Sequence, residues 1–98
     1  MDGIYEIKSN TPMGKMTGKI YLKEKGNFLI GCMIEIMGMK NNLEDGRMQG
    51  NKCYFTGNLK NNMMNLKYDI AAELIGNTLN IYAKTNMGEF KLQGTKIG

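Results

Sequence analysis

The segment TPMGKMTGKIYL, residues 11–22, joins a turn to a run in which apolar and polar residues alternate. Its first four residues, Thr-Pro-Met-Gly, suit a type I turn whose glycine takes the left-handed conformation and creates a bulge. The third place of such a turn usually takes a small polar residue, and here it takes Met13. The following run would place these residues on one face of a β-strand: Met16, Gly18, Ile20 and Leu22. The segment therefore predicts a β-hairpin with an apolar side chain at its tip.

Methionine turns recur along the chain at a nearly constant spacing. They lie at Met13, Met37 and Met87, with Met63 and Met64 filling the gap, so that successive turns are 24, 26 and 24 residues apart. A second series of turns, Gly-Asn pairs, begins at residues 26, 50 and 76. Gly-Asn between two strand-like runs favours a two-residue hairpin turn with a positive φ at the glycine. Two interlocked series with one spacing indicate four hairpin repeats of about 24–26 residues.

Eight runs of strand character lie between these turns. Eight consecutive strands linked by hairpins form a meander, and closing the meander into a barrel removes the exposed edges of the sheet. We therefore predict an all-β fold, a single eight-stranded antiparallel up-and-down β-barrel with residues 1–98 as one domain. The expected strands cover residues 3–10, 15–24, 28–36, 43–49, 52–60, 64–75, 78–85 and 89–96.

Composition limits the class of protein. The chain has 98 residues, of which 42% are hydrophobic, and this suffices for one modest core. It contains no apolar window of about 18 residues and no signal-peptide pattern, so we expect no membrane span and a cytoplasmic location. In that compartment Cys32 and Cys53 would be reduced, buried packing residues. The formal charge is +4, but the lysines are dispersed and Arg47 is the one arginine, so we do not expect nucleic acid as a partner.

The sequence contains no histidine. This removes the commonest general base and the commonest metal ligand. Glu35 and Glu44 could act together in acid–base chemistry if both pointed inward, and water-exposed positions at the rim are the alternative. Nothing else supports catalysis, so we expect no enzymatic activity, no cofactor and no metal site.

Alternate turns of an up-and-down barrel lie at the same end, so the methionine turns would surround one mouth. An eight-stranded barrel is either filled by side chains or holds one small ligand, and inward glycines either leave space or let the strands bend. The methionines either plug the mouth or form a flexible apolar entrance. Our leading hypothesis is a binding domain for a small hydrophobic ligand. The mouth would consist of Met13, Met37, Met63, Met64 and Met87. The interior would be lined by Ile20, Leu22, Phe55, Tyr68 and Phe90, with Glu35 as a polar anchor.

The eight-strand meander resembles the calycin group of barrels, which includes lipocalins, fatty-acid-binding proteins and avidins. The resemblance covers the whole chain and lies in architecture, since the chain has no tryptophan for the lipocalin Gly-x-Trp signature. It implies that a small apolar molecule binds inside a barrel. It assigns no individual ligand-contacting residue.

The run 28–36 is apolar on both faces, which leaves two registers open. In one register Leu29, Met33 and Glu35 point inward, and Ile30, Ile34 and Ile36 form an exposed stripe that could support a homodimer. The opposite register would bury that stripe and expose Glu35. A protein-interaction or homodimerisation module is therefore the second functional hypothesis.

Outward tyrosines give a third hypothesis, a binder of single-stranded nucleic acid. Tyr21, Tyr54 and Tyr82 would act as stacking platforms among lysines. Eight strands, rather than the five of an oligonucleotide-binding fold, argue against this hypothesis.

Overall fold

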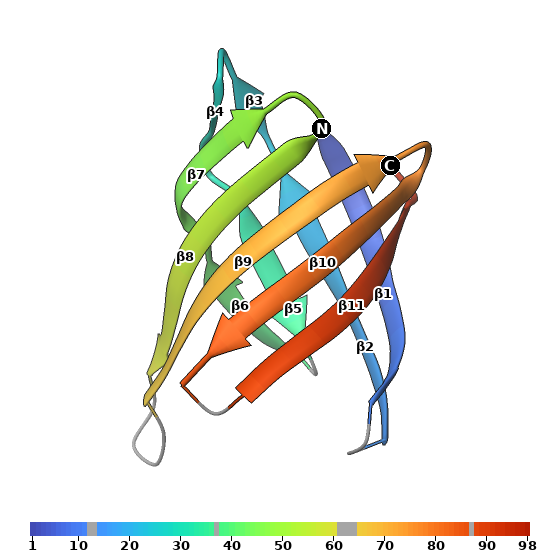
Figure 1. Cartoon of the computed structure of the whole chain (residues 1–98), viewed down its shortest axis with the longest axis vertical. Helices are drawn as coiled ribbons and strands as arrows, with labels where there is room; N and C mark the ends of the chain where they lie inside the picture. The colour runs from blue at the N-terminus through green and yellow to red at the C-terminus, as the bar shows by residue number, and fades with distance from the viewer. Residues whose placement is uncertain (12–13, 37, 61–64, 87) are drawn as a thin grey trace.

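The computed structural model describes the chain except at residues 12–13, 37, 61–64 and 87. In the described parts the strands are antiparallel and form one curled sheet, with β8 to β11 in front of β2 and β5 in Figure 1. The strands are β1 (Gly3–Thr11), β2 (Gly14–Leu22), β3 (Glu24–Lys25), β4 (Phe28–Leu29), β5 (Met33–Ile36), β6 (Met39–Asn42), β7 (Glu44–Gln49), β8 (Lys52–Lys60), β9 (Asn65–Ile75), β10 (Thr78–Thr85) and β11 (Gly88–Lys96). Their order across the sheet is β3-β4-β7-β8-β9-β10-β11-β1-β2-β5-β6.

The predicted all-β, antiparallel class is confirmed, but the predicted closed barrel of eight strands is wrong. The described sheet has eleven strands and stays open as a half-barrel, with β3 and β6 at its two ends. Gly31, with a φ of +72°, separates β4 from β5 within the predicted run 28–36. A residue in the left-handed conformation interrupts the extended backbone. The strand β6 was not predicted because lysine and asparagine have low strand propensity.

Backbone hydrogen bonds link the strand segments at these interruptions. The Ile30 amide donates to the Lys23 carbonyl at 3.0 Å, beside the break between β2 and β3. The Leu43 amide, between β6 and β7, donates to the Cys32 carbonyl at 2.9 Å. The peptide groups at these breaks therefore remain hydrogen-bonded although the strands themselves are short.

The predicted Gly-Asn turns are confirmed as two-residue hairpin turns. Their glycines, at 26, 50 and 76, have φ values of +64°, +62° and +61°. The backbone carbonyl of the asparagine in each turn also accepts a hydrogen bond from a backbone amide near the end of a later strand. Asn27 accepts from the Met48 amide at 3.1 Å, and Asn51 accepts from the Leu74 amide at 2.8 Å. The bond from the Lys96 amide to the Asn77 carbonyl, at 2.9 Å, repeats the pattern, so the sequence repeat has a structural counterpart.

Side chains on the inner face of the curl form one apolar core. The fully buried members include Tyr5, Ile7, Ile20, Phe55 and Leu79, each at most 2% exposed. Because every strand alternates, the opposite side chains face solvent. Among the residues whose burial is described, the buried hydrophobic side chains are Tyr5, Ile7, Ile20, Leu22, Leu29, Cys32, Ile34, Leu43, Cys53, Phe55, Ile70, Ala72, Leu79, Ile81 and Leu92.

The run 28–36 combines the two registers that the sequence left open. Leu29 is buried and Ile30 is 54% exposed, but after Gly31 the inward face passes to Cys32 and Ile34. The change of face follows from the left-handed glycine, which adds a residue between the two segments. Ile34 is buried, and Ile36 packs against the core. The exposed stripe on which the homodimer hypothesis depended is therefore reduced to Ile30.

Neighbouring atoms occupy the space where inward glycines lack a side chain. A Cβ atom at Gly18 would overlap the backbone carbonyl of Glu35, and one at Gly57 would overlap the ring of Tyr68. At Gly94 the same atom would lie 3.2 Å from the Cβ of Tyr5. These glycines permit close packing of strands and rings, so the space beside each of them is filled by protein atoms.

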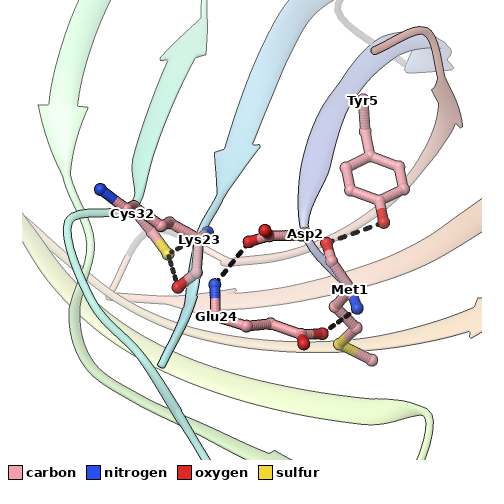
Figure 2. A network of polar contacts seen from close by, with 6 residues as sticks. All are labelled: Met1, Asp2, Tyr5, Lys23, Glu24 and Cys32. Carbon is pink, nitrogen blue, oxygen red and sulfur yellow. Dashed lines mark hydrogen bonds and ion pairs between the residues drawn. The ribbon is translucent and has the colours of Figure 1, made fainter. Parts of the chain in front are cut away.

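At the end that carries the Gly-Asn turns, polar contacts gather beside the core (Figure 2). The Met1 amine pairs with the Glu24 carboxylate, and the Tyr5 hydroxyl donates to the Met1 carbonyl at 2.9 Å. The Glu24 amide donates to Asp2 Oδ1 at 2.6 Å, and the Lys23 amide donates to Cys32 Sγ at 3.3 Å. These contacts connect β1, β3 and the segment before β5 at this end of the sheet.

The prediction that both cysteines are buried packing residues is confirmed. Cys32 and Cys53 are free thiols that are 1% and 0% exposed. Burial, and to a smaller extent the nearby Cys32, raises the pKa of the Cys53 thiol to about 12. Neither thiol is therefore expected to react with alkylating reagents near neutral pH while the protein is folded.

Stability should decrease at alkaline pH because of Cys53. The folded protein holds this proton more tightly than the unfolded chain, whose cysteines have a pKa of about 8.5. The contribution is complete below that value and is lost as the pH rises toward the folded pKa of about 12. We expect the urea midpoint, followed by circular dichroism, to fall between about pH 8 and pH 10. The variant Cys53→Ala should show a smaller fall, and an equal fall would contradict this assignment.

Candidate functional site

The lower end of the curled sheet in Figure 1 is where β1, β5, β8 and β10 finish. The next strands, β2, β6, β9 and β11, begin at the same end. The strand ends that flank the methionine turns therefore lie together, as the repeat predicts, and the Gly-Asn turns lie at the opposite, upper end. The five predicted mouth residues, Met13, Met37, Met63, Met64 and Met87, lie outside the described residues.

Burial of the inward side chains differs between the middle of the curl and its ends. Towards the upper end Leu22 and Phe55 are buried, and so is Ile20 in the middle of the curl. At the lower end the inward side chains of Met16 and Phe90 are half-buried. These five share that half-buried state: Met16, Ile36, Tyr68, Ala83 and Phe90. Met48 and Leu74, beside the Gly-Asn turns, are half-buried too, so the inner face is fully buried in its middle and partly accessible at both ends.

Tyr68 is the centre of this lower region. It lies opposite Gly57 on β8 and Thr85 on β10, and the missing side chain at Gly57 makes room for its ring. Asn41, on β6, donates a hydrogen bond from Nδ2 to the Tyr68 hydroxyl. β6 and β9 are not paired with one another, so this bond joins two separate parts of the curled sheet. It places one polar pair among apolar inward side chains.

Burial is the main cause that raises the pKa of the Tyr68 hydroxyl above its usual value. The hydrogen bond from Asn41 acts in the opposite direction, and the carboxylate of Glu44 acts in the same direction as burial. The hydroxyl is therefore neutral at physiological pH. Because the hydroxyl accepts the hydrogen bond from Asn41, its own proton can be donated to another acceptor.

Asn41 is a residue that sequence reasoning missed. It lies in a polar Lys-Asn-Asn stretch that was assigned to no strand. The available signal for its inward position was its spacing from Leu43, two residues later, because every second side chain of a strand lies on the same face. Ile34, its buried partner on β5, fixes the inward direction.

Glu35 does not lie on the inner face, so its predicted role as an inward polar anchor is not supported by its position. It lies opposite Lys19 on β2 and Lys40 on β6. Glu6 continues the same row on β1, opposite Lys19. The row alternates in charge across four strands on the outer face, and each opposite-charge pair is worth roughly 0.2–1 kcal/mol. Glu44, the other carboxylate considered for acid–base chemistry, is exposed.

Two further features concern metal binding and membrane spans. Among the described residues, no three or more cysteine, aspartate or glutamate side chains are grouped so as to hold a metal ion. The described segments also contain no helix with the length and apolar character needed to cross a membrane.

No protein-family model, curated protein or solved structure matches this chain. Function is therefore inferred below from the placement of the chain's own side chains.

Proposed function

We propose that this protein is a non-enzymatic binding domain, calycin-like in its mode of binding, for a small hydrophobic ligand held at the lower end of the curl. The observation that carries the proposal is the set of half-buried inward apolar side chains at this end, together with the inward polar pair of Tyr68 and Asn41. Met16, Ile36 and Phe90 offer apolar surface there. Burying such surface under a ligand is favourable by about 25 cal/mol per Å².

The polar pair at Tyr68 and Asn41 supplies an anchor for one end of the ligand. The Tyr68 hydroxyl accepts from Asn41 and can donate its own proton to a carbonyl or carboxylate oxygen. A ligand with an apolar body and a single polar head group fits this arrangement, because binding sites of this kind are mostly apolar with a few polar groups. Fully buried side chains such as Ile20 and Leu79 occupy the middle of the curl, and the ligand would lie below them.

Phe90→Ser should weaken binding of a dansyl-labelled fatty acid by about tenfold or more, because the ring supplies apolar contact area at the lower end. Fluorescence titration measures this affinity. Phe28→Ser is the matched control. Phe28 is 58% exposed at the upper end, so this substitution removes a phenyl ring that lies away from the site. Equal affinities for the two variants would contradict the proposed location.

Native mass spectrometry of protein purified from its own host tests the proposal without a chosen probe. We expect an additional bound species of small-molecule mass that is lost on denaturation. Protein that carries no such species, and that does not bind the fatty-acid probe, would overturn the proposed function.

A further inference from the structure

One row of side chains on the outer face combines exposed aromatic rings with cations. Tyr54 on β8 and Tyr82 on β10 are 39% and 37% exposed, and Ala71 on β9 lies between them in register. Arg47 on β7 lies opposite Tyr54, and Lys91 on β11 lies opposite Tyr82. Phe28, opposite Arg47, extends the row onto β4. Neighbouring strands are about 4.8 Å apart, so the two tyrosines stand about 10 Å apart across the small alanine.

A hollow of about 320 Å³ occupies the space between the two rings. Tyr54, Tyr82 and Ala71 contribute to its lining. Arg47 and Lys84 line it too, together with the carboxylates of Asp45 and Asp69. The charges in this hollow therefore balance, and its distinctive feature is the pair of exposed rings.

A second hollow, of about 590 Å³, lies on the other side of Tyr82. Lys8 and Lys91 bring two cations to it, and Asn10, Asn80 and Gln93 bring side-chain amides. None of the described residues that line it carries a carboxylate. Lys8 is itself paired with Glu6 at 3.1 Å but remains 66% exposed. This hollow is suited to an anionic group, because cations and amide donors converge on it.

Tyr82 lines both hollows and so joins the aromatic region to the cationic one. Glu89, on β11, accepts a hydrogen bond from the Tyr82 hydroxyl and raises its pKa. That contact holds the ring at the boundary between the two hollows. The carboxylates of Asp45 and Asp69 lie on the side away from Lys8, so an anionic ligand would orient its charge toward the second hollow.

We propose that this outer face binds single-stranded nucleic acid, with bases stacked on Tyr54 and Tyr82 and phosphates held at Lys8 and Lys91. The inference goes beyond the proposed hydrophobic-ligand function and uses a separate surface. It also revises the expectation that nucleic acid is not a partner, because the register brings dispersed residues into one row. Aromatic rings on a sheet stack bases of any sequence, and cations beside them neutralise the backbone. Tyr21 lies in another row, opposite Ile4 and Met33, and is not part of this surface.

Fluorescence anisotropy with a fluorescein-labelled thymidine oligomer of about 15 nucleotides tests the inference. We expect binding that weakens between about 50 and 200 mM salt, because phosphate contacts release counterions. Tyr82→Ala should weaken binding by about tenfold, Tyr54→Ala by a similar factor, and Tyr82→Phe by little, since the ring remains. Lys91→Glu should weaken binding more than Lys40→Glu, which makes the same charge change on β6.

Four results would overturn the inference. The first is absence of binding at low salt, and the second is equal loss in the Lys91→Glu and Lys40→Glu variants, which would indicate attraction to net charge alone. The third is thymidine monophosphate binding as tightly as the oligomer, which would indicate a mononucleotide site. Self-association of the protein that disappears in Tyr54→Ala would likewise overturn it, because a second copy would then occupy this face.

Discussion

Replacing Phe55 with alanine is expected to lower the free energy of unfolding by about 3–5 kcal/mol. Phe55 is 2% exposed and points inward from the middle of β8, opposite the buried Ile70 of β9. Its ring also closes over Gly46, where a Cβ would lie 2.8 Å from the Phe55 Cε1 atom. The loss combines transfer of apolar area to water with the cavity left behind. A domain of this length is stable by roughly 5–15 kcal/mol, so the change removes a large share.

Urea unfolding followed by circular dichroism measures this loss, with Tyr54→Ala as the control. Tyr54 is the neighbouring residue, and its ring lies on the outer face with 39% exposure. Its removal should cost less than about 1 kcal/mol, because few core contacts are lost. If the two variants lost the same stability, the assignment of the inner and outer faces of β8 would be wrong.

Gly57→Ala is expected to destabilise the protein by about 1–3 kcal/mol, and the effect should depend on Tyr68. The added Cβ would overlap the Tyr68 ring, which occupies the space over the glycine. In a Tyr68→Ala background the ring is absent, so the same substitution at Gly57 should cost little. The two substitutions should therefore be strongly non-additive, as expected of residues in direct contact.

A double-mutant cycle measured by urea unfolding checks this coupling. Tyr68→Phe is the matched variant, because it keeps the ring over Gly57 and removes only the hydroxyl that accepts from Asn41. The cost of Gly57→Ala should remain in the Tyr68→Phe background. Additive costs in the Tyr68→Ala background would show that the ring does not lie over the glycine.

The features of the fold that repeat along the chain could be predicted from sequence. The Gly-Asn turns follow from local conformation, because glycine takes a positive φ without steric cost. The inward positions of Ile20 and Phe55 follow from alternation within single runs. The split of run 28–36 at Gly31 could not be predicted, because glycine inside a strand pattern marks a bulge, a bend or close packing equally well.

The candidate site could be predicted only in part, because it depends on packing between distant strands. Tyr68 and Phe90 do lie on the inner face near the lower end, as alternation indicates. Ile20, Leu22 and Phe55, predicted as ligand-lining, lie within the sealed core. The predicted inward position of Glu35 depended on one of the two registers that the sequence left open for run 28–36. The bond between Asn41 and Tyr68, and the row through Tyr54 and Tyr82, arise from pairing across strands that no single run specifies.

The pairing of β1 with β11 sets the order in which the sheet can assemble. Among the described strands, β1 and β11 pair although they are the first and last along the chain, whereas the partners in every other pair are separated by no more than two strands. Short-range hairpins form with a small loss of chain entropy, and contacts between distant segments are made more slowly. The hairpins that lie between β1 and β11 along the chain can therefore form locally before these two strands pair. The pairing, the last seam of the sheet to form, includes the Ile7–Gly94 position and the hydrogen bond from the Ile97 amide to the Ile4 carbonyl. Breaking that seam opens the largest loop of the chain, so it returns the most chain entropy when the protein unfolds.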